Sequence, residues 1–140
     1  MKRIISFIIC LMIPISALAD DKFLEDFNVY ASSMYGIDEI SPVFTGNPKT
    51  YASAIVEIMD DGQSVTIMAE NKNALDLIAA ACCALRTIDN QGSVIDQYGK
   101  VMHAYFLTRS GEGEKRATTD SGLQIFISID HDFMTIRLVR

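Results

Sequence analysis

Cysteine is scarce in this sequence, and its three cysteines are poorly placed for pairing with one another. Cys10 falls in an N-terminal apolar segment, whereas Cys82 and Cys83 are adjacent. The Cys-x-x-Cys spacing of a thioredoxin-like redox site is absent. No histidine stands at a ligand spacing from the cysteine pair, as a zinc site would need. We therefore expect neither a redox site nor a metal cofactor.

Histidine is rarer still, and nothing around the two residues of this type resembles a catalytic site. His131 lies between two carboxylates in Asp130–Asp132, but adjacent turn residues diverge and one short cluster makes an incomplete metal site. His103 is expected inside a strand. No serine stands in a nucleophile-elbow motif. Gly111–Glu114 lacks the lysine of a phosphate-binding loop and carries acids instead. We expect no catalytic residue and no metal ligand, and hence not an enzyme.

Positive charge is in deficit. The chain has 12 lysines and arginines against 18 acids, which gives a net charge of −6. Nucleic-acid affinity depends on cationic contacts to phosphate, so a nucleic-acid partner is not expected. A cationic protein partner is compatible with this charge, although net charge does not identify one.

Long apolar runs are absent except at the N-terminus, where the pattern is that of a secretory signal peptide. Lys2 and Arg3 precede an apolar run from Ile4 to Ile15, and small residues follow at 17–19. A transmembrane anchor would need about 20 apolar residues, and this run is shorter. We therefore expect residues 1–19 to be removed, leaving residues 20–140 as a single domain in the bacterial periplasm or outside the cell. Loss of Lys2 and Arg3 takes the net charge to −8.

The mature chain should begin with a helix and a loop. Phe23, Phe27, Tyr30 and Met34 recur at helical spacing. Asp20 or Asp21 can cap this helix, and Gly36 can end it. The prolines and glycine within Ile37–Thr50 predict a loop there.

Two hairpins can be placed from their turns and their apolar alternation. A turn at Asp61-Gly62 pairs Ile58 with Val65, Val56 with Ile67 and Ala54 with Ala69. A turn at Asp130-His131 pairs Leu123 with Leu138, Ile125 with Ile136 and Ile127 with Met134, and a four-residue turn over 129–132 keeps the same pairs. Every pair is apolar and lies on one face, which a slip of one residue would destroy.

Between these hairpins we expect a helix over 72–88, capped by Asn71, then a strand over Val101–Arg109 and an exposed loop over 110–122. The element order is then α-ββ-α-βββ. It predicts a two-layer α+β domain, in which two helices cover one face of a five-stranded antiparallel sheet.

The adjacent cysteines point in different directions on the predicted helix. Cys82 lies in its apolar sector, whereas Cys83 lies about 100° away, between Lys72 and Asp76. A bond between them would strain the helix, so both are expected to be free thiols. Either the first helix covers Cys83, which we favour, or Cys83 lies at a twofold dimer contact and forms an intermolecular disulfide. The protein is accordingly expected to be a monomer or a homodimer.

These features favour a small exported protein that binds another protein in the periplasm, as an inhibitor or immunity-type protein would. The candidate binding residues are Cys83 and the pair Val43 and Phe44, which lies on a loop between two prolines. Packing of Phe44 into the domain's own core is the favoured alternative for that residue. A ligand-binding or sensory module with a pocket between helix and sheet is the alternative function.

The signal peptide gives the first testable prediction. Mature protein recovered from the periplasm should begin at Asp20, because small residues at 17–19 match the cleavage pattern. Intact mass measurement and N-terminal sequencing check this. Recovery of fractionated protein that still carries Met1 would contradict it.

Overall fold

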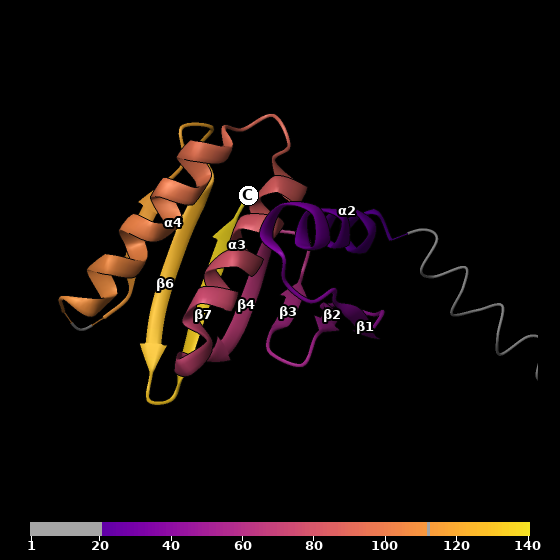
Figure 1. Cartoon of the computed structure of the whole chain (residues 1–140), viewed down its shortest axis with the longest axis horizontal. Coiled ribbons are helices and arrows are strands. Elements are labelled where there is room, and N and C mark those ends of the chain that lie inside the picture. The colour runs from indigo at the N-terminus through magenta and orange to yellow at the C-terminus, as the bar shows by residue number, and fades with distance from the viewer. Residues whose placement is uncertain (1–20, 112) are drawn as a thin grey trace, which may run out of the picture.

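The structure is a computed structural model that describes residues 21–111 and 113–140, so the predicted signal peptide lies outside the described residues. In this part of the chain, a seven-stranded antiparallel sheet has three α-helices on one face (Figure 1). The predicted α+β class holds, but the prediction of five strands and two helices is wrong.

The elements follow one another as three groups. The first is α2 (Lys22–Tyr30), the π-helical turn η1 (Ala31–Tyr35), β1 (Ser41–Phe44), β2 (Lys49–Ala52), β3 (Glu57–Asp60) and β4 (Ser64–Glu70). The second is the 3₁₀ turn η2 (Asn71–Asn73), α3 (Ala74–Ile88) and α4 (Val94–Arg109). The third is β5 (Lys115–Thr118), β6 (Gln124–Asp130) and β7 (Phe133–Val139).

The strands are ordered β1-β2-β3-β4-β7-β6-β5, so two meanders meet at the central pair of β4 and β7. That pair runs in register from Ser64 opposite Val139 to Glu70 opposite Phe133. Alternate residues of each strand point toward the helices and are buried, as period-2 alternation requires. The largest members of this core face are Tyr51, Ile58, Val65, Ile67, Ile125, Ile127, Ile136 and Leu138.

Each helix covers its own part of the sheet (Figure 1). α2 packs over β2 through the ring of Phe23, whose centroid lies 5.4 Å from that of Tyr51. The Tyr51 hydroxyl donates to Asp21 Oδ2 at 2.7 Å. α3 lies over β4 and β7, and α4 lies over β5 and β6. The core is therefore one layer between the helices and a single sheet face.

The first helix begins and ends as predicted. Asp21 Oδ1 accepts a hydrogen bond from the Leu24 amide at 3.0 Å and caps α2. Gly36 has a φ of 62° and ends the π-helical turn. The Asn28 side chain then bonds both the amide and the carbonyl of Ile40, at 2.8 and 3.0 Å. These two bonds hold the chain against α2 where it enters β1.

The predicted loop Ile37–Thr50 is wrong in part, because β1 and the first residues of β2 lie within it. β1 is an edge strand of four exposed residues that pairs only with β2. A proline is tolerated on an edge strand, where the missing N–H need not enter the ladder. Pro42 therefore did not exclude a strand here.

Both hairpins have the predicted apolar face, but the predicted registers are wrong by two residues. Ile58 faces Ile67 rather than Val65, and Ile125 faces Leu138 rather than Ile136. The first turn has Gly62 and Gln63 at its centre, with Asp61 before it accepting from the Gln63 and Ser64 amides at 2.9 and 2.7 Å. A two-residue shift leaves every side chain on the same face, so alternation could not detect it.

The predicted strand Val101–Arg109 is wrong, because these residues form the second half of α4. Likewise, the predicted loop 110–122 contains β5. Ser93 Oγ accepts a hydrogen bond from the Asp96 amide at 3.2 Å and caps α4. The Ser-x-x-Asp spacing is a helix-start signal that the sequence analysis missed. Asn71, the predicted cap of the α3 segment, instead donates to His131 O at 2.7 Å.

The turn between β3 and β4 supplies a stability test. Gly62 has a φ of 91°, a backbone conformation that a side chain strains. Gly62→Ala should lower the free energy of unfolding by about 1–2 kcal/mol, measured by chemical denaturation. Gln63→Ala, at the neighbouring exposed turn position, is the control and should change stability by less than about 0.5 kcal/mol. Equal effects of the two substitutions would contradict this turn geometry.

Candidate interaction surfaces

Val43 and Phe44, two of the residues singled out from the sequence, lie at the end of the edge strand β1. Their exposed fractions are 66% and 55%. The favoured alternative, in which Phe44 enters the domain's own core, is therefore not what the structure shows. We call this pair the β1 corner.

The Phe44 ring lies against the turn that follows β1. A Cβ atom at Gly46 would be 2.6 Å from Phe44 Cε1, so only glycine leaves room for the ring in this position. The ring therefore rests on backbone and keeps its outer surface in solvent. Such an aromatic side chain has less freedom to lose on binding than one on an open chain.

Charged groups of both signs adjoin the β1 corner. The turns β1–β2 and β3–β4 enclose an open hollow of about 280 Å³, lined by Gly46, Asn47, Lys49, Asp60, Asp61 and Gly62. Hydrogen bonds from the Ser64 and Gln63 amides hold the pKa of Asp61 below its usual value, so Asp61 is charged at neutral pH. Arg140 offsets the other acid, with Nη1 3.2 Å from Asp60 Oδ1.

The two edges of the sheet are poorly suited to adding a partner strand. Pro42 interrupts the donors of β1, and β5 begins with Lys115 and Arg116. Short edge strands that carry proline or cationic residues resist edge-to-edge pairing. A partner is therefore more easily accommodated by side-chain contacts than by main-chain addition.

The sheet face away from the helices carries a continuous side-chain row. Pairing registers place Thr50, Met59, Thr66, Arg137, Phe126 and Arg116 side by side across six strands. The Arg137 guanidinium lies 4.3 Å from the centre of the Phe126 ring, a cation–π contact that shields the ring. Four residues of this row are only partly exposed, namely Met59, Thr66, Phe126 and Arg137. The side chains of this face therefore cover much of one another's surface.

Cys82 and Cys83 are both fully buried. The helical wheel placed Cys83 in a polar sector, and α2 and η1 pack against α3 and cover that sector, which is the favoured one of the two predicted arrangements. Burial raises the pKa of Cys82 to about 11. Burial, followed by the neighbouring Cys82, raises the pKa of Cys83 to about 12. Tyr35 of η1 is close enough for hydrogen bonding to Cys82. Cys83 is thus not accessible at the surface.

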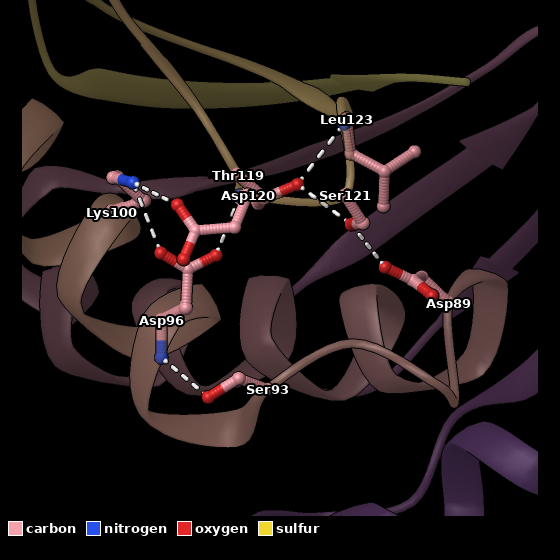
Figure 2. Close-up of polar contacts among 8 residues, drawn as sticks. All are labelled: Asp89, Ser93, Asp96, Lys100, Thr119, Asp120, Ser121 and Leu123. Carbon is pink, nitrogen blue, oxygen red and sulfur yellow. Dashed lines mark hydrogen bonds and ion pairs between the residues drawn. The ribbon is translucent and has the colours of Figure 1, made fainter.

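A polar network joins the start of α4 to the β5–β6 turn (Figure 2). Asp96 Oδ2 accepts from the Asp120 amide at 2.8 Å, and Lys100 Nζ lies 3.0 Å from Asp96 Oδ1 and 3.3 Å from Asp120 Oδ1. The hydrogen bond that the Asp120 amide donates lowers the pKa of Asp96, and the contact with Lys100 lowers it further. At the next residue of the turn, Ser121 donates to Asp89.

The α3–α4 connection is fixed by two more side chains. Arg86 donates to Gly92 O at 2.5 Å and to Asn90 O at 2.9 Å. The buried Gln97 donates to Asp89 O at 3.0 Å. Together with the network of Figure 2, these bonds fix which side of α4 faces the sheet. The bonds from Asp96, Lys100 and Ser121 join α4 and the α3–α4 connection to the β5–β6 turn, which is a structural role.

The two histidines lie at exposed positions, one in a turn and one on a helix. His131 has a φ of 53° in the β6–β7 turn, and its Nε2 lies 3.6 Å from Asp130 Oδ1 with both side chains exposed. His103 lies on the exposed side of α4 rather than in a strand. Among residues 21–111 and 113–140, no group of three or more His, Cys, Asp or Glu is arranged to hold a metal ion.

The outer side of α4 is an apolar surface that the sequence analysis missed. Ile95, Tyr98 and Phe106 have exposed fractions of 85%, 49% and 59%. At 100° per residue, they share one side of the helix with Gly99, Met102, Tyr105 and Arg109. We call these seven residues the α4 stripe. Gln97, Val101, Ala104 and Thr108 are buried on the other side.

Comparisons with known proteins return nothing for this chain: no protein-family model, no curated protein and no solved structure matches it. In the part of the chain that the structure describes, no helix is long and apolar enough to span a membrane. The surfaces above are therefore the basis for any functional proposal.

The buried thiols give a test of the cover over α3. At about pH 8 neither cysteine should react with a thiol reagent in the folded protein, and both should react in denaturant, measured by mass mapping. Because both pKa values are raised, each thiol stays protonated and neutral in the folded protein to a higher pH than in the unfolded chain. Their contribution to stability is therefore complete below the ordinary value near 9 and is lost as the pH rises toward 11–12. Reaction of Cys83 in the folded protein would contradict the cover.

Proposed function

We propose that this chain is a small exported, non-enzymatic protein that binds another protein in the periplasm, in the manner of an inhibitor or immunity-type protein. The observation that carries the proposal is the β1 corner, where Phe44 is held against Gly46 with its outer surface in solvent. Aromatic side chains that fill a pocket on the partner are typical binding hot spots.

The surroundings of the β1 corner suggest the chemistry of the partner. An apolar pair beside the charged Asp61 suits a partner with an apolar pocket and a cationic rim. The net charge, which is −6 for the whole chain and −8 once Lys2 and Arg3 are removed, adds a long-range attraction for the same cationic partner. An attraction between opposite charges mainly raises the association rate, and added salt weakens it.

Phe44→Ala tests the proposal. Since Phe44 is exposed, the substitution should change the free energy of unfolding by less than about 1 kcal/mol. Capture of the partner from a periplasmic extract should fall at least about tenfold, the effect of removing a hot-spot side chain. Immobilised protein, quantitative mass spectrometry of the retained proteins and a melting curve make the measurement.

Leu75→Ala is the matched control, because Leu75 is 75% exposed at the start of α3. It should retain the partner fully. Loss of the partner with both variants, or with neither, would count against the β1 corner. A large fall in melting temperature with Phe44→Ala would assign the ring to stability instead. A co-purifying small molecule, with no retained protein, would favour the ligand-binding alternative.

A further inference from the structure

The α4 stripe lies on a helix that already has a complete inner face. Gln97, Val101, Ala104 and Thr108 face the sheet and are buried. The polar network of Figure 2 and the bonds from Gln97 and Arg86 fix this orientation. The helix cannot turn to bury its outer apolar side chains without breaking those contacts. Within the described residues, Ile95, Tyr98 and Phe106 are thus left to solvent, whereas Met102 and Tyr105 are partly buried against the edge of the core and partly exposed.

Gly99 in the middle of the stripe has no explanation inside the protomer. Glycine in a helix interior is unfavourable relative to alanine. A Cβ at Gly99 would meet nothing within 4 Å, so no neighbouring group of the described chain requires its absence. A glycine on an exposed apolar helix side allows another backbone or a large side chain to approach closely.

The chemistry of the stripe is symmetric about Met102. At 100° per residue, Gly99 and Phe106 lie on one flank of Met102, and Tyr98 and Tyr105 lie on the other. In an antiparallel pair with its axis at Met102, each flank faces the same flank of the second copy. Gly99 of one copy would then face the ring of Phe106 of the other, and Tyr98 would face Tyr105. Ile95, close to the helix start, would meet the aliphatic stem of Arg109 at the helix end.

We propose that the α4 stripe is the contact between two copies of this chain, which associate through antiparallel α4 helices on a twofold axis at Met102. A twofold interface needs a surface that complements itself, and the pairs of Gly99 with Phe106 and of Tyr98 with Tyr105 about Met102 have that property. Antiparallel packing also sets the positive helix start beside the negative helix end of the second copy. This proposal does not rest on the one above, which uses the opposite end of the sheet.

The dimension of the stripe predicts the strength of the association. A helix of 16 residues is about 24 Å long. A standard interface buries about 800 Å² of accessible surface on each partner, and one helix face buries less than this. The dimer should therefore dissociate on dilution, and its measurement needs a concentration series.

Cysteine cross-linking tests the position of the twofold axis. The sample is the protein in the processed form that the cell produces. Helices that pack 8–10 Å apart bring facing Cα atoms to within about 4–6 Å, which a disulfide can bridge. Met102→Cys should give a disulfide-linked dimer under mild oxidation. His103→Cys, exposed but turned about 100° away, should give at least tenfold less. The native thiols of Cys82 and Cys83 are buried in both variants.

Sedimentation velocity over a concentration series tests the surface itself. Phe106→Asp should weaken association at least tenfold and leave the melting temperature of the monomer unchanged, because the ring is exposed. Phe44→Asp, an equally exposed aromatic position on the β1 corner, should associate like the wild type. Gly99→Ala should raise the melting temperature of the monomer yet weaken the dimer.

Three results would overturn the proposal. The first is a wild-type protein that stays monomeric up to its solubility limit. The second is equal cross-linking of the two cysteine variants. The third is a dimer that Phe106→Asp leaves intact, since it would use another surface. Loss of partner capture with Phe44→Ala, described above, is unaffected by any of these results.

Discussion

The whole core of this protein lies on one side of one sheet, and that constraint decides where everything else can go. In the part of the chain that the structure describes, three α-helices share a single apolar face, so they lie side by side and each has only one inner side. α3 is central and is covered on a second side by α2, which accounts for its unbroken buried run from Ala80 to Leu85. α4 flanks it and has no such cover. The exposure of its outer side follows from the layer architecture.

Side-chain alternation and local turn chemistry allowed part of this fold to be predicted. The helix from Asp21 to Gly36 has a capping side chain at one end and a left-handed glycine at the other, and both are local signals. The apolar faces of both hairpins were likewise visible in the sequence. Their registers were not, because Asp61 was assigned to the turn centre although it caps the turn from the position before it.

The remaining errors share a physical cause. β1 and β5 are edge strands of four residues, and most of their stabilisation comes from pairing with a neighbour rather than from their own sequence. In α4, apolar residues lie on both sides of the helix, so helical periodicity is weak and its second half resembles a strand. Among the candidate binding residues, Val43 and Phe44 are exposed, whereas Cys83 is buried. Cover of Cys83 by the first helix was the favoured expectation, because the aromatic side chains of that helix need a surface to pack against.

The central position of β7 has a consequence for how the chain reaches this structure. β7 is the last strand in the sequence, yet it lies between β4 and β6, and its pairing with β4 closes a loop of roughly 60 residues or more. Until the C-terminus is available, β4 and β6 both present open edges with apolar faces. Contacts of such long sequence separation slow folding. Shortened chains that lack β7 would therefore be prone to aggregation, and a fusion partner is better tolerated after Arg140 than within the final hairpin.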